Sequence, residues 1–196
     1  MATIPDLVLA SGSPRRRELL DGLGIDFRVR PVDLDESARD GEAPADLVLR
    51  LATEKAAANV GQGELVLAAD TLVVLEGAIL GKPEGEEDAR AMLERIQGRE
   101  HLVLTGIALL DGPNAKPATD VGTTRVRIGA MSSERIRWYV ATGEPLDKAG
   151  SYAIQGLGAT FVEGILGNYT NVVGLPIPAL KRLFASLGYD LLSFRR

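Results

Sequence analysis

The sequence of 196 residues contains no cysteine and a single histidine, His101. Without cysteine the chain forms no disulfide, and thiol catalysis and cysteine metal sites are excluded. One histidine provides no histidine pair for a metal ion, and we expect His101, at the start of a strand, to have a structural role. Neither Ser11 nor Ser13 has the histidine partner that a serine hydrolase triad requires.

The sequence also lacks an excess of positive charge and any apolar run long enough to span a membrane. The net charge of −5 argues against nucleic acid or a membrane surface as a partner. No apolar run reaches the roughly 20 residues of a membrane span, and no basic-then-apolar signal pattern opens the chain. We therefore expect a cytoplasmic protein. With 45% hydrophobic and 25% charged residues, the composition is typical of one globular domain over residues 1–196.

Hydrophobic periodicity predicts strands and helices that alternate at first and are then interrupted by two adjacent strands. We expect helices over residues 14–22, from Pro44 to Ala56, 86–97, 133–141 and from Pro176 or Pro178 to about 187. We expect strands over 7–10, 65–69, 101–110 and 121–130, and an extended segment over 27–32. Residues 71–75 either continue the third strand or pair in a hairpin, and 150–175 forms short strands and loops. This order favours a mixed α/β sheet with flanking helices.

The segment 7–20 combines a strand, a turn of small residues and a helix whose predicted cap is Ser13. Three arginines, starting at Arg15, occupy the first turn of this helix. A helix N-terminus is already partly positive, so each cation there costs about 0.3–1 kcal/mol. A polyanion bound at this end, held by backbone N–H groups, hydroxyls and guanidinium groups, would explain the pattern. The alternative is an exposed helix start whose arginines lie in solvent or pair with neighbours such as Glu18.

Two charged residues coincide with predicted buried surfaces. Asp70 follows the apolar run 65–69, so it lies at the end of a strand, where open α/β sheets place ligand sites. If the strand ending at Ala10 is parallel to it, Asp70 and the arginine turn share one edge. A carboxylate there can bind a divalent ion, orient a water or accept its proton, or it can simply cap a turn. Lys55 continues the apolar stripe of its helix, and it either extends to solvent or meets a buried partner.

Three further residues are candidates for binding. Lys82 does not belong to a phosphate loop, because the glycine spacing is one residue short and Pro83 replaces the serine or threonine. As a point charge in a turn it can still bind phosphate. Glu36, in an acidic turn-rich segment, is either a second metal carboxylate or part of a solvated loop. Gln155, beside glycines, either reads the edge of a base with its amide or is exposed in a turn.

Taken together, these segments resemble the Maf family of nucleoside triphosphate pyrophosphatases. The matching segments run in order through most of the chain: 9–16, 69–71, 81–83, 144–150, 154–156 and 173–176. The resemblance implies a curved mixed sheet with two lobes around a cleft, similar to inosine triphosphate pyrophosphatases. It also implies hydrolysis of a nucleoside triphosphate to the monophosphate and pyrophosphate with Mg²⁺ or Mn²⁺. The resemblance alone suggests a homodimer and attack at the α-phosphorus.

The resemblance also implies roles for individual residues. Asp70 would activate the attacking water and, with Glu36, hold the metal. The residues around the triphosphate would be Ser11, Arg15, Arg16, Lys55 and Lys82. Arg15, Thr71 and Gln155 resemble the set in members acting on dTTP and UTP, whereas members acting on 7-methylated GTP carry a Trp, Gln, Glu pattern. A neutral glutamine suits the amide edge of uracil or thymine, so we expect a dTTP/UTP pyrophosphatase that also accepts modified pyrimidine nucleotides.

Two other functions are compatible with the same residues. Maf-like proteins are also associated with restraint of septum formation, so the chain could be a non-catalytic nucleotide-binding regulator. It could also be a house-cleaning enzyme for deaminated purines, similar to the inosine triphosphatases. The combination of Asp70 with Lys55 and Lys82 favours an enzyme, because binding alone requires no acid to activate water. No activated side-chain nucleophile is visible in the sequence, so we expect direct attack by water.

Overall fold

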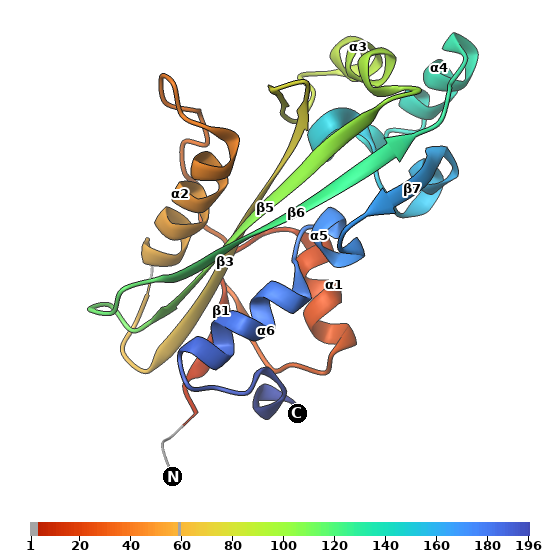
Figure 1. Cartoon of the computed structure of the whole chain (residues 1–196). Helices are drawn as coiled ribbons and strands as arrows, with labels where there is room; N and C mark the ends of the chain where they lie inside the picture. The colour runs from red at the N-terminus through yellow and green to blue at the C-terminus, as the bar shows by residue number, and fades with distance from the viewer. Residues whose placement is uncertain (1–3, 59) are drawn as a thin grey trace. The chain divides into compact units, whose positions relative to one another are not determined.

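The computed structural model describes residues 4–58 and 60–196. In this part of the chain the strands form a seven-stranded sheet with the order β2-β1-β3-β5-β6-β7, and β4 pairs with β3 (Figure 1). The strands are β1 (Asp6–Leu9), β2 (Arg28–Val29), β3 (Glu64–Leu75), β4 (Ala78–Leu80), β5 (Glu100–Asp111), β6 (Ala118–Ile128) and β7 (Val162–Leu166). β1 is parallel to β2 and β3, while β4 and β7 pair antiparallel to β3 and β6. The predicted mixed sheet is confirmed.

The helices begin and end close to the predicted positions. They are α1 (Pro14–Gly22), α2 (Pro44–Ala57), α3 (Glu86–Ile96), α4 (Ser133–Ala141), α5 (Tyr169–Val173) and α6 (Ile177–Ser186). Short 3₁₀ helices span Glu144–Asp147, Ala149–Ser151, Gly156–Phe161 and Leu191–Phe194. Within residues 27–32, expected to be extended, Arg28–Val29 form the strand β2. One prediction needs correction: 150–175 contains the helix α5 besides short strands and loops. No helix in the described ranges is long and apolar enough to cross a membrane.

The chain divides into two compact units. The first contains the residues up to Asp70 together with Thr105–Gly122 and Gly174–Arg196, and the second contains Thr71–Leu104 and Thr123–Val173. The strands β3, β5 and β6 each continue from one unit into the other along the chain. The boundary in β3 falls between Asp70 and Thr71, so the candidate residues are divided between the units.

In the first unit, α2 covers one face of β1 and β3 and α1 with α6 covers the other (Figure 1). Strand alternation produces this division, because successive side chains point to opposite faces. The residues facing α1 and α6 are Leu7, Leu9, Leu65, Leu67 and Ala69. Those facing α2 are Val8, Ala10, Val66 and Ala68. Asp70 continues the second series, which directs its side chain toward α2.

Small residues allow α2 to pack closely on the sheet. Ala52 and Ala56 are fully buried on the sheet side of α2. On β5, Gly106 lies directly against the backbone of Val48, and a Cβ atom added there would collide with the Val48 carbonyl. The short separation brings the later turns of α2, including Lys55, next to β3.

The core of the second unit lies between its strands and the helices α3 and α4. His101 is buried in this unit, and its Nε2 is hydrogen-bonded to the Tyr152 hydroxyl at 2.8 Å. Burial lowers the pKa of His101 from 6.5 to about 4. A neutral histidine packed edge-on against a tyrosine ring agrees with the structural role predicted for it.

Candidate active site

The arginine turn and Asp70 emerge at the same edge of the sheet. β1 and β3 are parallel, and Leu9 at the end of β1 pairs with Leu67. Asp70 lies three residues beyond Leu67, and the turn that begins at Ser11 lies two residues beyond Leu9. Parallel strands place their carboxyl ends together, which is where ligands bind in open α/β sheets. The parallel pairing, on which a shared edge for Asp70 and the arginine turn depended, is present in the structure.

The turn between β1 and α1 is organised by Ser11 rather than Ser13. Ser13 occupies the N-cap position of α1 and Pro14 follows it, as predicted, but within the described residues the Ser13 hydroxyl makes no hydrogen bond to a helix N–H group. The Ser11 hydroxyl oxygen instead accepts from the Ser13 backbone N–H at 3.3 Å and from Arg16 Nη1 at 2.9 Å. Arg16 Nε also donates to the Gly174 carbonyl oxygen at 2.8 Å. These contacts fix the Arg16 guanidinium at the start of α1.

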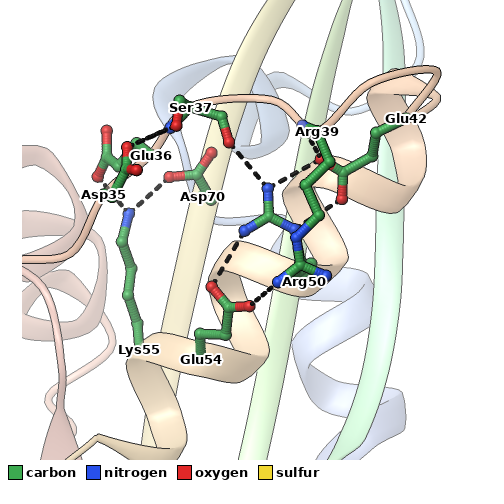
Figure 2. Close-up of polar contacts among 9 residues, drawn as sticks. All are labelled: Asp35, Glu36, Ser37, Arg39, Glu42, Arg50, Glu54, Lys55 and Asp70. Atoms are coloured by element: carbon green, nitrogen blue, oxygen red, sulfur yellow. Dashed lines mark hydrogen bonds and ion pairs between the residues drawn. The ribbon is translucent and has the colours of Figure 1, made fainter.

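Lys55 joins the two candidate carboxylates (Figure 2). Its Nζ donates to Asp70 Oδ1 at 2.7 Å and to Glu36 Oε1 at 2.6 Å. The Lys55 and Asp70 side chains are 7% and 9% exposed, whereas the Glu36 side chain is 51% exposed. Of the two alternatives for Lys55, the structure shows the buried partner. One carboxylate is therefore sheltered and the other is open to solvent, with an ammonium group between them.

Arg16 belongs to the same electrostatic cluster. Burial lowers the pKa of the Arg16 guanidinium, the Asp70 and Glu36 carboxylates oppose this shift, and the neighbouring Arg15 adds to it. The first unit thus brings together two cations at a helix start, a buried ion pair and an exposed carboxylate. Positive groups so arranged can hold a polyanion, and the Arg16 guanidinium is already ordered by its contacts with Ser11 and Gly174.

Asp70 and Glu36 fit a divalent cation of the magnesium type. Mg²⁺ is commonly bound by one or two carboxylates together with substrate phosphates and waters, rather than by a protein cage. Asp70 and Glu36 approach the same Lys55 ammonium group, so their oxygens converge on one region. No group of three or more acidic or histidine side chains suited to a metal occurs in the described ranges. A cation here would therefore complete its coordination with waters or with a bound phosphate.

The other candidate residues lie in the second unit. Thr71 is half-buried in β3, Lys82 is exposed in the loop after β4, and Gln155 is exposed just before a 3₁₀ helix. The loop of Lys82 is tied to a second segment of this unit, because the Gly150 N–H donates to the Gly81 carbonyl at 3.0 Å. The glycine beside Gln155 is required by the backbone: Gly156 has φ +66°, in the left-handed region.

Glu144 organises the loop that carries Gln155, a role not predicted from the sequence. Its Oε1 accepts from the Tyr139 hydroxyl and the Gly158 N–H, both at 2.8 Å, and its Oε2 accepts from the Leu157 N–H at 3.0 Å. These hydrogen bonds lower the pKa of Glu144 although burial opposes the shift. Its half-buried carboxylate thus holds the backbone just after Gln155 in one conformation.

Arg50 was also not singled out from the sequence. It lies on α2 and binds Glu42, Glu54 and the backbone of Ser37 (Figure 2). The spacing of Arg50 and Glu54, four residues apart on a predicted helix, was the only available signal. Such pairs are common on exposed helix faces, so the spacing alone could not mark a functional residue.

Comparison of the sequence with known proteins identifies the family of this chain. The model of Maf-like proteins matches residues 6–187. A dTTP/UTP pyrophosphatase of Anaeromyxobacter sp. (strain Fw109-5) is 53% identical over 94% of this chain and 91% of its own length. The dTTP/UTP pyrophosphatase of Pelotomaculum thermopropionicum is 48% identical over 95% of this chain and 99% of its own.

Two solved Ham1 protein structures are similar at 18% identity. The Staphylococcus aureus protein has a TM-score of 0.44 over 63% of this chain and 71% of its own. The Coxiella burnetii protein has a TM-score of 0.48 over 81% of this chain and 80% of its own. The family assignment rests on the sequence matches, which extend over nearly the whole chain. The chain belongs to the Maf family of Maf-like proteins.

Proposed function

We propose that this chain hydrolyses dTTP and UTP to the monophosphate and pyrophosphate, and that it accepts modified pyrimidine nucleotides as well. The observation that carries the proposal is the sheltered Lys55–Asp70 pair beside the Arg16 turn. The names of relatives about 50% identical over some 95% of the chain support the substrate class. Binding of an anion alone would not explain an acid placed next to the cations that hold it.

In this proposal Asp70 accepts a proton from the attacking water. The water oxygen forms a bond to the α-phosphorus, and the bond from that phosphorus to the bridging oxygen breaks, so pyrophosphate leaves. Lys55 orients the Asp70 carboxylate through a contact of 2.7 Å. Ser11, Arg15 and Arg16 hold the triphosphate and offset the charge that develops on its oxygens. No covalent intermediate with the protein is required.

A divalent cation, Mg²⁺ or Mn²⁺, completes the proposed site through Asp70 and Glu36. When bound, such an ion stabilises negative charge on phosphate oxygens. Lys82, Thr71 and Gln155 are assigned from the family resemblance: Lys82 to the phosphates, and Thr71 and Gln155, with Arg15, to the base. The Gln155 amide offers both a donor and an acceptor, as the neutral edge of thymine or uracil requires.

A nucleotide panel tests the proposal directly. Pyrophosphate release is measured with Mg²⁺ for dTTP, UTP, ITP and 7-methylated GTP, with separate assays of nucleotide binding. We expect the highest kcat/KM for dTTP and UTP. Faster turnover of ITP would support a house-cleaning enzyme for deaminated purines, and binding without turnover would support a nucleotide-binding regulator; either result contradicts the proposal.

The variant Asp70→Asn tests the assigned proton acceptor. It keeps the shape of the side chain and removes its basicity, so we expect kcat to fall by about 10²–10⁴, the usual contribution of a general base. The matched control is Asp120→Asn, which makes the same change at a residue that pairs with Arg182 on α6. Circular dichroism confirms that both variants are folded. Near wild-type kcat in folded Asp70→Asn would remove Asp70 from this role.

A further inference from the structure

The segment 31–43, between β2 and α2, contains no helix or strand and carries Glu36. The Glu36 side chain is 51% exposed, so burial does not hold it in place. Its carboxylate nevertheless lies 2.6 Å from Lys55 Nζ. Besides this ion pair, the position of the carboxylate depends on the contacts that hold the backbone of the segment.

Arg50 ties the segment to α2 at two points (Figure 2). Its Nε and Nη2 donate to the two carboxylate oxygens of Glu42 at 2.6 and 2.8 Å. Nη2 also donates to the backbone carbonyl of Ser37, the residue after Glu36, at 3.0 Å. The third nitrogen, Nη1, donates to Glu54 Oε2 at 3.1 Å, and this contact fixes the guanidinium relative to α2. The planar guanidinium thus contacts the segment directly beside Glu36 and again near the start of α2.

Other contacts of the segment are more exposed to solvent. The Arg39 side chain, which donates to Glu54, is 68% exposed, whereas that of Arg50 is 14% exposed. Asp35 accepts from the N–H and hydroxyl of Ser37 at 3.0 and 2.6 Å, which shapes the turn around Glu36 but does not attach it to α2. Exposed ion pairs contribute little order, because solvent screens them. Besides the Lys55–Glu36 pair itself, Arg50 is thus a sheltered attachment between this segment and α2.

We propose that Arg50 is a positioning residue that holds the Glu36 carboxylate beside Lys55 and Asp70 and so sets the affinity of the site for a divalent cation. The inference rests on the proposed function, in which Glu36 and Asp70 hold that cation. Arg50 acts through the backbone of Ser37 and through Glu42. A lysine cannot replace it, because one ammonium group does not supply three donors in a fixed plane.

The test uses the full chain with Arg50→Met and Arg50→Lys. Loss of a residue that orients a metal ligand typically weakens metal affinity 10- to 100-fold. We expect the Mg²⁺ concentration for half-maximal activity to rise about tenfold, while kcat at saturating Mg²⁺ stays within about threefold. Binding of Mn²⁺ without nucleotide, followed by its paramagnetic resonance signal, should weaken by about the same factor. Arg182→Met is the matched control, because this arginine lies on α6, is 64% exposed and pairs with Asp120 on β6.

Hydrogen exchange gives a readout independent of metal and activity. We expect the amides of residues 35–39 to exchange faster in both Arg50 variants and in Glu42→Gln, with Tm measured to establish folding. If Arg50→Met does not fold, Arg50→Lys and Glu42→Gln decide the question. Wild-type Mn²⁺ affinity together with wild-type exchange at 35–39 in the folded variants would overturn the proposal.

The same design separates this inference from the proposed function. If the wild-type chain releases no pyrophosphate from any nucleotide, the proposed function fails. Mn²⁺ binding and hydrogen exchange then still decide the role of Arg50. A wild-type chain that binds no Mn²⁺ would also overturn the inference about Arg50.

Discussion

Lys55 lies on the core-facing side of α2, where a lysine can either extend to solvent or meet a buried partner. The sequence could predict the face of the helix, because the spacing of apolar residues sets it. It could not predict the partner, because Asp70 lies on a strand and Glu36 in a loop, and only the packed fold brings them to one atom. A buried pair of this kind adds little net stability, but losing one member is costly, because an unpaired charge is left behind.

The variant Lys55→Met should therefore destabilise the protein. It leaves the buried Asp70 carboxylate without its closest cation, and we expect the free energy of unfolding at pH 7 to fall by about 3 kcal/mol. Urea unfolding followed by circular dichroism measures the change. Lys116→Met, in an exposed loop, makes the same substitution and should stay within about 0.5 kcal/mol of wild type. Equal stability of the two variants would show that the Lys55–Asp70 pair is not the buried contact described.

Gln155 provides a test of base recognition. Gln155→Glu removes the amide donor and places a negative charge near a neutral base, so we expect kcat/KM for dTTP and UTP to fall at least roughly tenfold, the effect of leaving a polar partner unpaired. Steady-state kinetics with both nucleotides gives the ratio. Gln62→Glu, at an exposed turn position, controls for the added charge. If both variants keep the wild-type kcat/KM, Gln155 does not read the base.

At the scale of elements, most boundaries of helices and strands could be predicted, because the signals that set these boundaries lie within short segments of sequence. Proline at the start and glycine near the end mark α1, and Ser132 caps α4 by accepting from the Arg135 N–H at 3.2 Å. Tertiary contacts decide the features that these local signals leave open. β2 is short because only Arg28 and Val29 pair with β1. Within the ranges that the structure describes, Ser13 occupies the N-cap position of α1 without a side-chain cap hydrogen bond. The nearby Ser11 hydroxyl accepts from the Ser13 N–H and from Arg16.

The close packing of α2 on β5 leads to a prediction about Gly106. Gly106→Ala would place a methyl group against the Val48 carbonyl, and overpacking of this kind costs about 1–3 kcal/mol. Because α2 carries Lys55, a shift of the helix should also lower kcat. Gly22→Ala, in open space at the end of α1, is the matched control and should not lose stability. Chemical denaturation and steady-state kinetics of both variants test this, and unchanged stability in Gly106→Ala would contradict the described contact.

At the scale of the whole molecule, stability should fall in two steps as the pH decreases. Burial lowers the pKa of His101 from 6.5 to about 4 in the folded chain. As the pH falls, the unfolded chain therefore binds a proton at His101 near pH 6.5, whereas the folded chain binds it only near pH 4. Hydrogen bonds from Arg50 and Arg30 lower the pKa of Glu42 and Glu64 from 4.5 to about 2. Their contribution is complete above pH 4.5 and is lost as the pH falls to about 2. In both windows the unfolded state binds more protons, so stability increases with pH.

Urea unfolding at intervals between pH 8 and pH 2 measures these steps. His101→Gln should remove the first, which amounts to about 3 kcal/mol for a shift of this size. The double variant Glu42→Gln, Glu64→Gln should flatten the second. A wild-type curve without slope between pH 6.5 and pH 4 would show that His101 is not buried in its neutral form.

Arg50 and Lys55 lie five positions apart on the same helix, α2. One residue inserted between them would rotate Lys55 by about 100° about the helix axis and move it along by about 1.5 Å. The ammonium group would then no longer reach Asp70, whatever the chemical character of the inserted residue. The turn between β5 and β6 is not subject to this restriction, since no candidate residue lies in it. Insertions and deletions should therefore be tolerated at the β5–β6 turn and should abolish activity within the middle turns of α2.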